Sequence, residues 1–146
     1  SIGGVPVSPL IIPGVFGVVA GYAAWHWGVY PALADVSATS AFGGTVASIS
    51  TTMLGFLLAA LAVLASISHT HLLGVMREQG HYRDLLNTML IGFVFFLICA
   101  IEGFSVLFGV SLTPWLGSAL VGTHVAAFLS LLDIGRKLWL VLRNLK

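Results

Sequence analysis

Residues 86–110 read LNTMLIGFVFFLICAIEGFSVLFGV, and Glu102 is the only charged side chain among them. About 20 apolar residues are enough for a helix to cross the hydrocarbon core of a bilayer, which is about 30 Å thick. Because lipid cannot satisfy free backbone groups, a span must be an α-helix or a strand of a closed barrel. Barrel strands alternate apolar and polar residues, and this stretch does not. It therefore predicts a transmembrane helix that carries a carboxylate.

The composition places the whole chain in the same class. The 146 residues are 58% hydrophobic and only 8% charged, whereas about 25% of the residues of a soluble domain are charged. A net charge of +1 and the lack of a basic run argue against nucleic acid as a partner. Cys99 is the single cysteine, which excludes an intrachain disulfide and a Cys-x-x-Cys pair. We expect no metal site and no cofactor.

Three other apolar stretches accompany residues 86–110. We expect membrane spans near residues 10–30, 47–68, 86–110 and 115–134, with a short amphipathic tail over residues 135–146. All six basic residues fall between the second and third spans or in the tail. Four spans put these two regions on the same side of the membrane, and the positive-inside rule makes that side cytoplasmic.

The expected fold class is therefore an all-α integral membrane protein. A single domain over residues 1–146 would consist of a bundle of four transmembrane helices with both termini in the cytoplasm. We expect this bundle in the inner (plasma) membrane of a bacterium, with the lipid bilayer as its first partner.

Charged residues at the cytoplasmic ends are expected to anchor the helices. Asp133 precedes Arg136 and Lys137 by three and four residues, a spacing that puts all three on one helix face. We interpret these three residues as a structural anchor, with Arg77 and Arg83 as the corresponding charges of the middle connection.

Small residues recur four positions apart in three of the spans. Residues at this spacing share a helix face, and small side chains allow the close backbone approach that drives helix association in lipid. Since one bundle needs fewer such faces, we expect at least one of them to contact a second copy of the chain. The alternative is that all of them close a monomeric bundle. The expected packing or subunit contacts are Gly17, Gly21, Ala24, Gly55, Ser118, Gly122 and Ala126.

Glu102 is predicted to meet His124 inside the membrane. The two residues are equally far along the chain from Thr113, in the turn between the last two spans, so antiparallel helices place them at the same depth. An unpaired charge there costs about 2.5–3.5 kcal/mol on insertion scales, and such a residue normally faces a partner or water. Ser105 or Thr123 would complete the hydrogen bonds. Other polar residues at a comparable depth would form a polar collar around the pair, namely His26, Ser48, Thr51, Thr52 and Thr123.

The sequence shows no constellation typical of an enzyme, such as a phosphate-binding loop, a zinc-protease helix or a nucleophile elbow. We expect a homo-oligomeric channel or pore-type protein, a class that includes membrane-acting toxins and immunity or defence effectors. The alternative is an accessory or anchor subunit of a larger membrane complex, held by a cytoplasmic or membrane partner. A haem-binding redox subunit, with His26 and His124 as axial ligands, is a weaker alternative.

The topology can be tested by labelling single cysteines at Asp35 and Gln79 in a background without Cys99. The charge distribution predicts that a membrane-impermeant reagent added outside labels the Asp35 site and spares the Gln79 site. Equal labelling of the two sites from outside would contradict this orientation.

Overall fold

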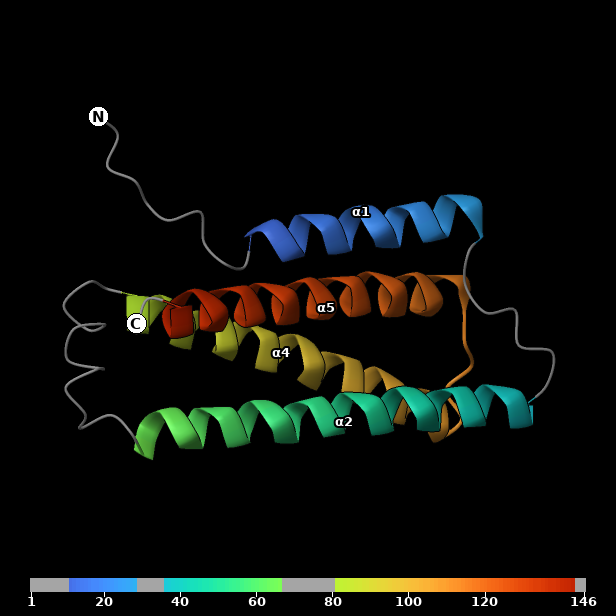
Figure 1. The fold of residues 1–146 in the computed structure, drawn as a ribbon. Helices are drawn as coiled ribbons and strands as arrows, with labels where there is room; N and C mark the ends of the chain where they lie inside the picture. Colours follow the sequence, from blue (N-terminus) through green and yellow to red (C-terminus); the bar gives the residue numbers. More distant parts are fainter. Residues whose placement is uncertain (1–10, 29–35, 67–80, 144–146) are drawn as a thin grey trace.

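The computed structural model describes residues 11–28, 36–66 and 81–143. These residues form four helices and no strands, namely α1 (Ile11–Trp27), α2 (Val36–Ser66), α4 (His81–Leu107) and α5 (Pro114–Arg143) (Figure 1). In α2, α4 and α5 the apolar part is long enough to cross a membrane. With 17 residues, α1 spans roughly 25 Å at 1.5 Å per residue, which makes it shorter than the expected first span.

The four helices lie in a row in the order α1, α5, α4, α2 (Figure 1). Among the described residues, the backbone of α1 approaches α5 alone, and the backbone of α2 approaches α4 alone. The central pair is α4 and α5, which the turn 108–113 joins. The first two helices of the chain therefore flank the last two on opposite sides, and α1 and α2 do not close a ring.

The contact between α1 and α5 depends on glycine. A Cβ atom on Gly17 would lie 2.7 Å from the carbonyl oxygen of Gly122, and a Cβ on Gly122 would lie 2.7 Å from that of Gly17. Gly21 would meet the Ser118 carbonyl at 3.1 Å. The two small-residue stripes expected at packing or subunit contacts thus meet each other within one chain. Ala24, Ser118 and Ala126 are buried along with them.

A second glycine contact joins α2 to α4, and the sequence analysis did not foresee it. A Cβ on Gly43 would lie 2.6 Å from the backbone nitrogen of Leu107, and one on Gly103 would lie 2.6 Å from the nitrogen of Ala47. Gly43 lies outside the expected second span, residues 47–68. Gly55, by contrast, is exposed and has no atom within 4 Å of its Cβ position.

Two helices extend beyond the expected membrane spans. The second helix begins at Val36, well before the expected residue 47. The expected tail continues α5 as far as Arg143. Hydropathy marks only the part of a helix that suits lipid, whereas the backbone hydrogen bonds continue beyond it. The middle connection falls largely in residues 67–80, outside the described residues.

The turn between α4 and α5 has recognisable end signals. Gly109 adopts a positive φ of 97°, the conformation that commonly ends helices at glycine. The Thr113 hydroxyl oxygen accepts a hydrogen bond from the Leu116 backbone N–H at 3.3 Å, which caps the first turn of α5. Pro114 then occupies the first helical position, where a missing N–H costs nothing.

Ion pairs join α4 and α5 at the end of the row opposite this turn. Lys137 lies 2.9 Å from a carboxylate oxygen of Asp84 on α4 and 3.1 Å from one of Asp133 on α5. Arg136 pairs with Asp133 at 2.9 Å. Arg83 is exposed in the first turn of α4. Arg77, the remaining expected anchor, lies outside the described residues.

The interior of the row is apolar, and much of its outer surface is apolar as well. Leu57, Leu85, Met89 and Cys99 are almost fully buried at the centre. Large side chains such as Val18, 73% exposed, point outward. In water an exposed apolar surface of this extent would favour aggregation, whereas it suits contact with lipid.

We expect Gly103→Ala to lower the free energy of unfolding in detergent by about 1–3 kcal/mol, because the added methyl would force two backbones apart. Gly55→Ala is the matched control, since its new methyl meets open space. Chemical denaturation followed by circular dichroism measures both variants. Equal stability of the two would contradict the close approach of α2 and α4.

Candidate functional site

Glu102 lies on α4, half-buried, and its side chain is held by the neighbouring helix α5. The Thr123 hydroxyl lies 2.6 Å from Oε2 of Glu102, to which it donates a hydrogen bond. Ser105, one turn further along α4, instead donates to the Ile101 carbonyl of its own helix at 2.7 Å. A polar contact between α4 and α5 therefore forms within the apolar part of both helices.

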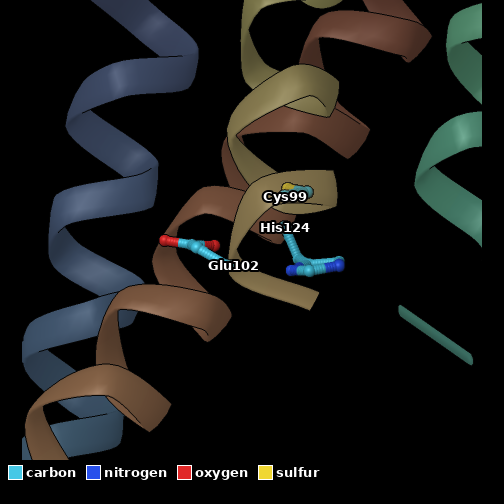
Figure 2. A group of neighbouring side chains, drawn as sticks. All are labelled: Cys99, Glu102 and His124. Carbon is cyan, nitrogen blue, oxygen red and sulfur yellow. The ribbon is translucent and has the colours of Figure 1, made fainter. Parts of the chain in front are cut away.

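His124 comes directly after Thr123 and is also half-buried. Its Nδ1 lies 2.7 Å from the Leu120 carbonyl oxygen, which can accept a hydrogen bond from that nitrogen. A ring nitrogen of His124, a carboxylate oxygen of Glu102 and the sulfur of Cys99 all lie within 4.8 Å of one another (Figure 2). Among the described residues no direct hydrogen bond joins Glu102 to His124. The two side chains lie close together, and Thr123, which directly precedes His124, donates a hydrogen bond to Glu102.

Cys99 is the member of this group that was not predicted from the sequence as a site residue. Its side chain is fully buried, and it precedes Glu102 by three residues on the same face of α4. The sequence pattern that could have predicted this is Cys99-x-x-Glu102, with His124 at the same depth on the next helix. A single cysteine forms neither an intrachain disulfide nor a Cys-x-x-Cys pair, and no other role was predicted for it from the sequence alone.

The expected polar collar is not gathered into one site. Thr123 alone joins the group around Glu102. Ser48, Thr51 and Thr52 lie on the exposed face of α2, and the two threonine hydroxyls donate to carbonyls of their own helix. His26 is exposed on α1, where its ring stacks on that of Tyr22 with centroids 6.2 Å apart.

Ser50 is a further polar residue at this depth. The contacts of Gly103 with Ala47 and of Gly92 with Leu57 set the register of α2 against α4, which puts Ser50 level with the Cys99 turn. The Ser50 side chain is 1% exposed, and among the described residues its hydroxyl oxygen has no hydrogen-bond partner. Burial without a partner costs about 1–3 kcal/mol for a hydroxyl.

Two grooves reach the group of polar residues, one on the α1 side and one on the α2 side. A groove of about 680 Å³ lies along α1 and α5, and Thr123 and Gly122 are among its lining residues. A second groove of about 490 Å³ lies between α2 and α5, and His124 and Phe96 contribute to its lining. In Figure 2 the Glu102 side chain points toward α1 and that of His124 toward α2. The group therefore extends through the α4–α5 layer from one groove to the other.

Comparisons with protein-family models, curated proteins and solved structures found no match to this chain. The class of protein therefore rests on the fold. In the part of the chain that the structure describes, every regular element is a helix and three helices are long and apolar enough to cross a membrane. Their apolar outer surface suits contact with a bilayer.

We expect Thr123→Val to lower the free energy of unfolding in detergent by about 1–3 kcal/mol, because Glu102 loses its hydrogen-bond donor in a partly buried place. Thr51→Val is the matched control, since the Thr51 hydroxyl bonds only to its own helix. Denaturation of the two variants in the same detergent gives the comparison. A Thr51→Val variant as unstable as Thr123→Val would attribute the loss to the threonine-to-valine change itself.

Proposed function

We propose that the protein assembles from several copies in the inner membrane of a bacterium and conducts a cation across it, with Glu102, Thr123 and His124 as the ion- or water-accessible site. The observation that carries the proposal is the position of Glu102, which is held by Thr123 within the apolar part of α4. Ionisable residues inside membrane helices are rare, and they mark ion or proton pathways by default.

Access to the site supports this role. Thr123, the partner of Glu102, lines the groove along α1 and α5, and His124 lines the groove between α2 and α5. In the groove between α2 and α5, His124 is the only polar side chain among the lining residues, whereas the groove along α1 and α5 is also lined by Ser118, Tyr22 and two tryptophans. Rings of acidic side chains are a known basis of cation selectivity in channels.

The open row of helices supports assembly from several copies. Since α1 and α2 each approach one other helix, a single chain does not surround a central path, and a conducting path would form between copies. The stripes on α1 and α5 are used within the chain, so the exposed stripe Thr51, Gly55 and Ala59 of α2 is the remaining small-residue face for close helix approach. We propose that the ends carrying Asp84 and Lys137 face the cytoplasm, following the distribution of basic residues.

Ion flux from reconstituted liposomes tests this function. We expect the wild-type protein to form a defined oligomer and to conduct a cation. Glu102→Gln should reduce the flux by about tenfold or more, because tenfold corresponds to only about 1.4 kcal/mol and a charge in the membrane interior is worth more. Ser105→Ala, one turn away with a hydroxyl bonded to its own helix, should conduct as wild type.

Two outcomes would overturn the proposal. A homogeneous oligomer with no flux of H⁺, Na⁺ or K⁺ at any voltage or pH would leave the anchor subunit as the better reading. Flux that Glu102→Gln and Ser105→Ala change equally would remove Glu102 from the conducting path.

A further inference from the structure

We propose that Cys99, Glu102 and His124 bind a divalent metal ion of the zinc class within the membrane. The inference concerns the same residues as the proposed function and goes beyond it, because it assigns them a bound metal ion. It stands on the geometry of three side chains from two antiparallel helices.

The distances between the three ligand atoms suit a single ion. The sulfur, one carboxylate oxygen and one ring nitrogen lie within 4.8 Å of one another (Figure 2). Zinc bonds of about 2.0–2.3 Å in a tetrahedral arrangement put neighbouring ligand atoms about 3.3–3.8 Å apart. Binding would therefore require rotations of the side chains that bring the ligand atoms up to about 1.5 Å closer together.

The donor atoms select the class of metal. Thiolate, imidazole and carboxylate are the three side-chain donors of zinc. Magnesium and calcium prefer oxygen ligands, so the buried sulfur of Cys99 argues against both. Copper and cobalt accept the same mixture of ligands, which makes cobalt a suitable spectroscopic probe.

Charge balance gives a physical reason for a cation here. A thiolate and a carboxylate carry two negative charges, which a divalent ion neutralises, and a neutral site is far less costly in a membrane than a lone Glu102. No lysine or arginine among the described residues forms an ion pair with Glu102. Arg136 and Lys137 of α5 are instead engaged at its far end, with Asp84 and Asp133.

Two neighbouring groups already hold the ligands as metal sites usually do. Histidine ligands commonly donate one ring N–H to a backbone carbonyl, and ligating carboxylates are themselves hydrogen-bonded. Here Leu120 offers its carbonyl to Nδ1 of His124 at 2.7 Å, and the Thr123 hydroxyl donates to Glu102 at 2.6 Å. The unpartnered Ser50 hydroxyl at the level of Cys99 is a further polar group available at this depth.

Cobalt binding to the purified protein tests the site without any measurement of flux. We expect one Co²⁺ per chain, with a thiolate-to-cobalt charge-transfer band and the visible bands of tetrahedral Co²⁺, both abolished by added Zn²⁺. Because Cys99 is the only cysteine, Cys99→Ser should abolish the charge-transfer band. His124→Ala should weaken binding at least as much as the loss of an outer partner of a ligand does, about 10–100-fold.

His26→Ala is the matched control, because His26 is exposed on α1 and stacks on Tyr22. It should bind Co²⁺ as wild type does. Thr123→Val keeps all three ligands and loses only the hydrogen bond to Glu102, so it should bind with intermediate affinity. Circular dichroism of each variant confirms that the helices are folded.

The outcomes separate this inference from the proposed function. A charge-transfer band that survives Cys99→Ser, equal losses for His124→Ala and His26→Ala, or no band from folded protein would each overturn the metal site. Cobalt binding without flux would uphold the metal site and overturn the channel, whereas flux of H⁺, Na⁺ or K⁺ without cobalt binding would do the reverse.

Discussion

Helices inside a bilayer gain no hydrophobic free energy from leaving lipid, so their association depends on close contact of their backbones. Glycines supply that contact twice in this chain. Gly17 and Gly122 bring α1 onto α5, and Gly43 and Gly103 bring α2 onto α4. In each case a methyl group would lie less than 3 Å from backbone atoms of the other helix. These contacts fix which helix lies beside which, and hence the row α1, α5, α4, α2.

The central pair, α4 and α5, is held differently. Its polar contacts lie at two levels, the ion pairs of Lys137 at one end and the Glu102–Thr123 hydrogen bond nearer the other end, within the apolar part of both helices. An ion pair at the end of a helix can reach water, so its cost is small. Glu102 lies within the apolar part of α4, where the same charge is expensive unless a proton or a cation compensates it. The level of Glu102 is therefore where a titratable side chain lies within the apolar part of the helices.

The open arrangement of the helices, in which α1 and α2 each approach one other helix, gives this level its access. In a closed bundle, Glu102 and His124 would face a common interior. In the row, Thr123 contributes to a groove on the α1 side and His124 to a groove on the α2 side. The same arrangement leaves the outer face of α2 free for contact with lipid or with another chain. The proposed ion conduction between copies and the proposed metal binding within one copy both rest on this geometry.

The sequence alone determined how far along its helix each residue lies. It predicted four spans, three of which are helices long and apolar enough to cross a membrane. It also set Glu102 and His124 at one depth by counting residues from Thr113, and put Asp133 on one face with Arg136 and Lys137. Only the tertiary structure decided how each helix is rotated and which helix it meets. That is why the contact of Gly43 with α4, the membership of Cys99 in the polar group and the scatter of the expected collar were not foreseen. Position along a helix follows from a rise of about 1.5 Å per residue, whereas rotation and neighbours depend on contacts between residues far apart in the chain.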